Sequence, residues 1–203
     1  MIQFELRMKL ILASSSPQRA EVLRNAGFLF EIIPAHVDES CREGETAGNF
    51  VRRLAETKAS TVAALLPQAS QPAIVVGADT VICVDGLILG KPANAHNAGE
   101  ILRRLSGRTH EVITGLAVLS WPGGVRRVEQ ESTRVTFVSL KESEIEDYVA
   151  SGEPLGKAGA YAIQGLGGRF VERVEGCYFN VVGLPLARLY RILHEMESSR
   201  AAS

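Results

Sequence analysis

Several polar side chains of this sequence lie where apolar runs end, and their types suit the binding of phosphate. In LILASSSPQR, residues 10–19, an apolar run ends in three serines, followed by a proline and an arginine. A strand-to-helix turn, with Ser16 as N-cap and Pro17 at the first helical position, explains these residues. The same turn also forms an anion site, because free backbone N–H groups and the helix dipole face a ligand above Ser14, with Arg19 as a bidentate donor. This segment alone does not decide between the two interpretations.

A second candidate is Asp79, which interrupts the β-branched run VVGADTV, residues 75–81. Such an aspartate can cap a turn, or it can bind a divalent cation or activate water. Glu39 follows a predicted strand, where a solvated loop is the simpler interpretation. Lys91 follows the hairpin signal Asp85-Gly86, which folds it back toward Asp79, although a lysine before a proline is usually a surface charge.

Other polar residues have ordinary structural explanations. Arg53 and Lys58 lie on a predicted helix, where they can form a charged face, and His110 is more typical of a structural hydrogen-bonding residue than of a base. The glycine-rich segment 156–168 carries Gln164, whose amide can make the paired hydrogen bonds that read the edge of a base.

The elements that must position these residues alternate along the chain. Strands are predicted at 10–13, 28–33, 74–84, 87–89, 111–121, 124–138 and 169–175, and helices at 17–25, 47–66, 94–105, 143–151 and 185–197. The pattern predicts an α/β or α+β fold with a mixed sheet, built as a single domain over residues 1–203. Residues 1–7 are expected to be an N-terminal extension and residues 197–203 a frayed tail.

The composition excludes several classes of partner. A formal net charge of -1 argues against a bulk electrostatic partner such as nucleic acid or an anionic membrane. No run approaches the roughly 18 apolar residues of a membrane span. The three cysteines are odd in number and far apart, which predicts neither disulfides nor a zinc site and fits a reducing cytoplasm.

Taken together, the candidate residues indicate a nucleoside triphosphate bound with Mg²⁺. The cations are Arg19, Lys58 and Lys91, and the candidate metal ligands are Glu39 and Asp79. The sequence has no GxxxxGK[ST] motif, no GxGxxG motif and no GxSxG elbow, so a P-loop, a Rossmann cradle and serine hydrolase chemistry are not supported.

The motifs LASSSPQR, VDE, RLAETKA, VVGADTV, GKP, LSGRTHEVITG, GKAGAYAIQGLGG and NVVGLPL, in this order, resemble the Maf family of nucleotide pyrophosphatases. The resemblance covers about residues 9–189. Thr80, directly after the aspartate of the ADT motif, and the late motif KAGAYxIQG are similar to the branch that acts on dTTP and UTP. The branch that acts on 7-methyl-GTP has a glutamine after the aspartate.

The resemblance implies hydrolysis between the α- and β-phosphates, with a divalent cation (Mg²⁺ or Mn²⁺), in a homodimer. It implies a twisted mixed sheet with flanking helices in two lobes around a cleft, similar to inosine triphosphatase. It implies that Asp79 is the base or activates metal-bound water and that Glu39 is associated with metal. The positions matched to phosphate contact are Ser14, Arg19, Lys58 and Lys91, and those matched to base selection are Gln18, Thr80 and Gln164.

This chain departs from the family pattern at two positions: Gln18 stands where arginine is usual, and Gly156 stands where aspartate is common. Two alternatives to a dTTP/UTP pyrophosphatase stay open from the sequence. One is a nucleotide-binding regulator of cell division or septum formation, for which the carboxylates of Glu39 and Asp79 would have no use. The other is a 7-methyl-GTP pyrophosphatase, which the context of Thr80 and Gln164 opposes.

Overall fold

The computed structural model describes residues 8–67 and 71–201, so the expected extension at residues 1–7 lies outside the described residues. The chain forms two compact units. Unit 1 contains the described residues up to Asp79, Thr114–Glu131 and the residues from Gly183 onward, and unit 2 contains Thr80–Ile113 and Ser132–Val182.

In the described part of the chain, seven strands form one mixed sheet. They are β1 (Lys9–Leu12), β2 (Phe30–Ile32), β3 (Ala73–Val84), β4 (Leu87–Leu89), β5 (Thr109–Trp121), β6 (Arg126–Phe137) and β7 (Val171–Glu175). The order is β2-β1-β3-β5-β6-β7, and β4 pairs with β3. β1 is parallel to both β2 and β3, whereas β4 is antiparallel to β3 and β7 is antiparallel to β6. The predicted mixed sheet with flanking helices is confirmed.

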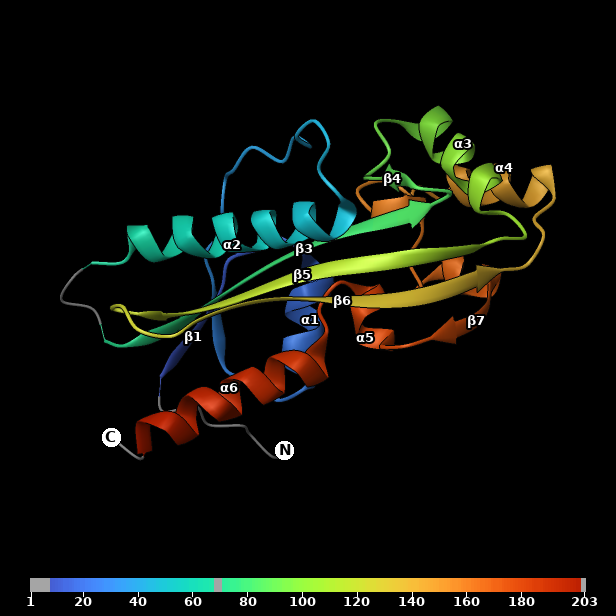
Figure 1. Cartoon of the computed structure of the whole chain (residues 1–203). Coiled ribbons are helices and arrows are strands. Elements are labelled where there is room, and N and C mark those ends of the chain that lie inside the picture. Colours follow the sequence, from blue (N-terminus) through green and yellow to red (C-terminus); the bar gives the residue numbers. More distant parts are fainter. Residues whose placement is uncertain (1–7, 68–70, 202–203) are drawn as a thin grey trace. The chain divides into compact units, whose positions relative to one another are not determined.

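Unit 1 carries the helices α1 (Pro17–Asn25), α2 (Ala47–Leu65) and α6 (Leu186–Ala201). Figure 1 shows α2 along one face of the strands of this unit and α6 on the opposite face. The apolar stripe of α2 packs on the strands through one set of buried side chains, which includes Ala55, Ala59, Val62, Ile11 and Val75. Small residues dominate this contact, so the helix and the sheet approach closely.

Two glycines make that approach possible. A Cβ on Gly77 of β3 would overlap the carbonyl oxygen of Ala55 in α2, and a Cβ on Gly115 of β5 would overlap the carbonyl oxygen of Val51. Both obstacles are helix backbone, which cannot move aside as the end of a flexible side chain can. Glycine at these positions therefore sets the spacing between α2 and the sheet.

Unit 2 has its own core, under the helices α3 (Ala95–Leu105), α4 (Glu142–Ala150) and α5 (Tyr178–Val182). Side chains of the long strands meet those of α3, α4 and the late loop there, among them Ile82, Leu102, Phe137, Tyr148 and Phe170. At the surface, Arg103 of α3 donates to the carboxylate of Glu142 at the start of α4. Each unit thus buries a separate apolar cluster.

Several strands begin or end one or two residues away from the predicted bounds, and the predicted and observed elements differ further in three places. The short helix α5 was not predicted, because five residues are too few to show a helical period. The glycine-rich loop contains two 3₁₀ turns, Ala158–Ala160 and Leu166–Phe170, and the second delays the start of β7 from residue 169 to Val171.

The third difference concerns the end of the chain. The final helix was predicted to end near Glu197, followed by a frayed tail, but α6 continues through Ala201, and residues 202–203 lie outside the described residues. None of the helices in the described ranges combines the length and hydropathy needed to cross a bilayer.

The spacing of α2 on the sheet predicts that Gly77→Ala destabilises the protein. The added methyl group must push α2 away from β3, and overpacking of this kind costs about 1–3 kcal/mol of the free energy of unfolding. Gly90→Ala is the matched control, because a Cβ there meets no atom within 4 Å. Urea denaturation measures both, and equal midpoints for the two variants would contradict the packing argument.

Candidate functional site

The turn from β1 into α1 is built by serine side chains. Ser16 caps the helix, since its Oγ accepts a hydrogen bond from the backbone N of Arg19 at 3.4 Å, and Pro17 occupies the first turn. The Oγ of Ser14 accepts a hydrogen bond from the backbone N of Ser16 at 3.2 Å. The predicted N-cap and helix start are confirmed, so the capped-turn interpretation holds whether or not a ligand binds above it.

Two hydrogen bonds hold the side chain of Arg19 next to this turn. Its Nε donates to the carbonyl of Gly183 at 2.8 Å, and its Nη1 donates to the Oγ of Ser14 at 3.1 Å. The side chain is buried, and this burial lowers the pKa of the guanidinium, while the nearby carboxylates of Asp79 and Glu39 act in the opposite direction. A fixed guanidinium of this kind is preorganised to meet an anion.

Lys58 forms the second cationic centre, and it bridges two carboxylates. Its Nζ lies 2.6 Å from Oδ1 of Asp79 and 2.6 Å from Oε1 of Glu39. The side chains of Lys58 and Asp79 are only 7% and 11% exposed, whereas that of Glu39 is 45% exposed. A buried carboxylate needs such a partner, because an isolated charge in the interior is very costly.

Secondary structure explains why these groups meet. Side chains alternate along β3, so Asp79 lies on the same face of the strand as Gly77, toward α2. Lys58 lies on the buried face of α2, one residue before Ala59, whose backbone N is among the atoms nearest to a Cβ built on Gly77. The close approach of helix and strand therefore brings the ammonium group to the carboxylate.

We refer to Ser14, Arg19, Glu39, Lys58 and Asp79 as the Lys58 cluster. All five belong to unit 1. The cluster combines two fixed cations with two carboxylates and a hydroxyl group, and its formal charge is zero. It can bind phosphate oxygens through the cations and can offer carboxylate oxygen to a metal ion or to water.

The carboxylates fit a metal that is shared with substrate. Within the described ranges, no group of three or more His, Cys, Asp and Glu side chains is placed to hold a metal ion. Mg²⁺ is usually bound through one or two carboxylates together with substrate phosphates and water, rather than by an all-protein cage. Glu39 and Asp79 are a donor set of that size.

The remaining predicted site residues have different surroundings. Gln18 is half-buried on the first turn of α1, and its Oε1 accepts a hydrogen bond from the Oγ of Ser16 at 3.1 Å. Thr80 follows Asp79 directly, so its side chain lies on the other face of β3. Lys91 and Gln164 are exposed, and together with Thr80 they belong to unit 2.

The sequence did not predict the residues that hold the Gln164 loop. Glu153 accepts hydrogen bonds from the backbone N of Leu166 at 3.0 Å and of Gly167 at 2.9 Å. Tyr148, fully buried, donates to Glu153 at 2.7 Å and accepts from the backbone N of Ala162 at 3.1 Å. Burial alone would raise the pKa of Glu153, but the hydrogen bonds from Gly167, Leu166 and Tyr148, together with the charge of Lys157, lower it. The feature of the sequence that could have revealed this anchoring is the pair of glycines at 165 and 167, where a Cβ would collide with Glu153 or Tyr148.

Gly156, the second departure from the family pattern, lies at the start of this loop with φ +75°. Aspartate is one of the few other residues that enter this left-handed region readily. The left-handed conformation at residue 156 is therefore open to both residues, and the difference between them is the side chain.

His110 is part of the core of unit 2. Its Nε2 lies 2.9 Å from the hydroxyl of Tyr161, and its ring packs edge-to-face on Phe137 at 5.0 Å. Burial lowers the pKa of His110 to about 4, so the imidazole is neutral near pH 7. These surroundings agree with a structural histidine.

Comparison with known proteins identifies the class. A family model described as "Maf-like protein" matches residues 9–196. The chain belongs to the Maf family.

Several curated relatives carry a more specific name. A protein of Koribacter versatilis (strain Ellin345), named dTTP/UTP pyrophosphatase, is 48% identical over 193 residues, which are 95% of this chain and 97% of that protein. A protein of the same name from Syntrophus aciditrophicus (strain SB) is 47% identical, covering 95% of this chain and 92% of its own length. One from Pelotomaculum thermopropionicum is 49% identical, covering 91% and 95% respectively.

The buried His110 predicts a pH dependence of stability. Its pKa is lower in the folded protein than the ordinary value of 6.5, so the unfolded chain binds the proton first and stability is lost as pH falls from about 6.5 to about 4. Between pH 7 and pH 5 this group should remove about 2 kcal/mol of the free energy of unfolding.

Urea denaturation of wild type and His110→Gln at both pH values measures the effect, because the variant lacks this contribution. His96→Gln is the control, since the side chain of His96 is 83% exposed. If wild type and His110→Gln lost the same free energy between pH 7 and pH 5, the burial argument would be wrong.

Proposed function

We propose that this protein is a nucleoside triphosphate pyrophosphatase that hydrolyses dTTP and UTP to the monophosphate and pyrophosphate, in a house-cleaning role. Its membership of the Maf family and the shared name of three relatives at 47–49% identity support this proposal. The structural observation that carries it is the Lys58 cluster, in which a buried carboxylate is held beside two fixed cations. A protein that only sensed nucleotide would need the cations but not Asp79.

The cations act on the phosphates in this proposal. Arg19, fixed by Ser14 and Gly183, offers a planar fork to phosphate oxygens, and Lys58 offers a point charge. We also assign a phosphate contact to Lys91. Such contacts carry no information about the base, so they should serve every triphosphate equally.

Asp79 is the proposed general base. Its carboxylate takes the proton of the attacking water, or would activate water held by the divalent cation, and the ammonium group of Lys58, 2.6 Å from Oδ1 of Asp79, balances its charge. Glu39 and Asp79 would hold the divalent cation, Mg²⁺ or Mn²⁺. When bound, that cation supplies charge neutralisation at the phosphates and lowers the pKa of its water.

Selection of the base is assigned to Gln18, Thr80 and Gln164. The hydrogen bonds that Glu153 and Tyr148 make to the 162–167 loop support this role for Gln164, because a residue that reads a base edge must be held in place. Gln18 offers a neutral amide at a position where the family usually has the charged, planar guanidinium group of an arginine.

We further propose that the chain acts as one domain, as a homodimer, in the cytoplasm. The three cysteines, Cys41, Cys83 and Cys177, are all free thiols, which supports a reducing compartment.

Asp79→Asn should abolish turnover without unfolding the protein. An amide cannot accept the proton, and general-base assistance contributes about 10²–10⁴-fold to kcat. The measurement is pyrophosphate release from UTP and dTTP at saturating Mg²⁺, with circular dichroism to verify folding. The matched control is Asp85→Asn, which alters an exposed carboxylate paired with Arg108. A kcat near wild type in Asp79→Asn would mean that Asp79 is only structural.

Gln18→Arg should sharpen the preference among pyrimidine triphosphates. With glutamine, we expect UTP, dTTP and CTP all to be turned over, and a bidentate contact to a base is worth about 1–3 kcal/mol of discrimination. The ratios of kcat/KM for the three nucleotides measure the change, with Gln130→Arg on β6 as the control. Unchanged ratios in Gln18→Arg would show that residue 18 does not face the base.

A further inference from the structure

The segment that carries Glu39 has little regular structure of its own. Between β2 and α2, residues 33–46 contain no helix or strand, and none of them is buried. Ile33 and Ala35, at its start, pack against the apolar cluster of unit 1, but residues 36–46 are not part of that cluster, and a segment with few apolar contacts opens at low free energy. Yet Oε1 of Glu39 lies 2.6 Å from the buried Lys58, so other contacts must hold the segment in place.

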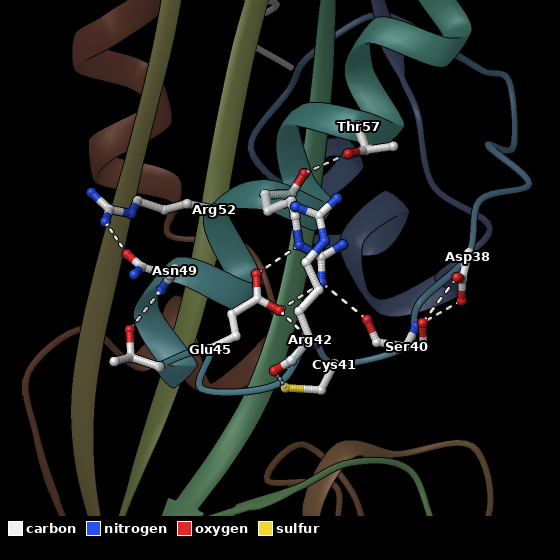
Figure 2. A network of polar contacts seen from close by, with 10 residues as sticks. Asp38, Ser40, Cys41, Arg42, Glu45, Asn49, Arg52 and Thr57 are labelled. Atoms are coloured by element: carbon white, nitrogen blue, oxygen red, sulfur yellow. Dashed lines mark hydrogen bonds and ion pairs between the residues drawn. The ribbon is translucent and has the colours of Figure 1, made fainter.

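Arg53 supplies those contacts from the second turn of α2. Its Nε donates to Oε1 of Glu45 at 2.6 Å and its Nη2 donates to Oε2 of Glu45 at 2.7 Å, which makes the pair bidentate. The same Nη2 donates to the carbonyl of Ser40 at 3.0 Å. Figure 2 shows Ser40 and Glu45, from different parts of the segment, both connected to this network. The side chains of Arg53 and Glu45 are 19% and 9% exposed, so the pair is largely shielded from water.

Local hydrogen bonds extend this hold to both neighbours of Glu39. Asp38 accepts from the backbone N and from the Oγ of Ser40, both at 2.9 Å, which closes a tight turn around Glu39. The backbone N of Arg42 donates to Oε2 of Glu45 at 3.1 Å. Glu39 therefore lies within a turn whose last residue, Ser40, is fastened to α2 through Arg53.

We propose that Arg53 and Glu45 are positioning residues: they clamp the 38–45 segment onto α2 and thereby hold Glu39 where it can take part in binding the divalent cation. The inference rests on the proposed function, because it assumes that Glu39 and Asp79 bind the metal. Hydrogen bonds from Arg53 lower the pKa of Glu45 to about 2, so the clamp stays ionised over the neutral range.

The chain offers a matched pair of variants for the test. Arg53→Lys keeps the charge but loses the planar fork that reaches both Glu45 and Ser40. Arg52→Lys is the control, because Arg52 is the adjacent residue of the same helix and its guanidinium donates to Asn49 rather than to the segment (Figure 2). Glu45→Gln removes the charge from the other side of the clamp and serves as a second variant if Arg53→Lys fails to fold.

Two measurements on the full chain test the clamp, and neither depends on catalysis. The first is amide hydrogen exchange of residues 36–45 without metal, which should accelerate about tenfold or more in Arg53→Lys and Glu45→Gln but not in Arg52→Lys. The second is Mn²⁺ affinity, followed by electron paramagnetic resonance, which should weaken about 10–100-fold, as is typical when a residue that orients a metal ligand is lost.

A kinetic readout separates the clamp from the proposed function. With UTP, the Mg²⁺ concentration for half-maximal rate should rise in Arg53→Lys while kcat at saturating Mg²⁺ stays near wild type. Unchanged exchange and unchanged Mn²⁺ affinity, or a loss of kcat that saturating Mg²⁺ does not restore, would overturn the clamp. If the wild-type protein released no pyrophosphate from any triphosphate, the proposed function would be overturned instead. The hydrogen-exchange measurement would still test the clamp, because it does not require catalysis.

Discussion

The ion pair between Lys58 and Asp79 is the interaction on which the site depends. Asp79 is itself buried and follows a stretch of β3, residues 73–78, in which every residue is buried, and a carboxylate there is tolerated only with a cation at hydrogen-bond distance. The ammonium group of Lys58 reaches Asp79 because Gly77, which has no side chain, allows the backbone of α2 to lie close to β3. The contact between α2 and β3 therefore builds the core of unit 1 and also places Lys58 beside Asp79.

Lys58 also links the rigid part of the site to its exposed part. On one side it contacts the buried Asp79, and on the other it contacts Glu39, which lies on a segment without regular structure. Arg19 adds a second cation that is fixed independently, by the carbonyl of Gly183. The site therefore combines groups fixed by helix and strand with one carboxylate whose place depends on the Arg53–Glu45 clamp.

The sequence predicted the helices and long strands well, because apolar spacing marks which face of an element is buried. It also singled out Asp79, since a carboxylate within a β-branched run is conspicuous. It selected Lys58 as a cation of the site but did not predict its ion pair with Asp79, because Lys58 appeared only as a charge on a helix and spacing gives no distance to a strand 21 residues away. The short helix α5 was missed because five residues are too few to show a helical period, and the anchoring of the late loop was missed because it depends on contacts between Glu153 and residues 13 and 14 positions further along the chain.

The most direct test of this account is a double-mutant cycle on the buried pair, with Lys58→Met, Asp79→Asn and both together, measured by urea denaturation. Lys58→Met should cost about 3–5 kcal/mol of the free energy of unfolding, because it leaves a buried charge without a partner. Adding Asp79→Asn should recover a large part of that loss, while the double variant releases no pyrophosphate from UTP. If the two single effects simply added, within about 0.5 kcal/mol, the pair would not be coupled and the account would be contradicted.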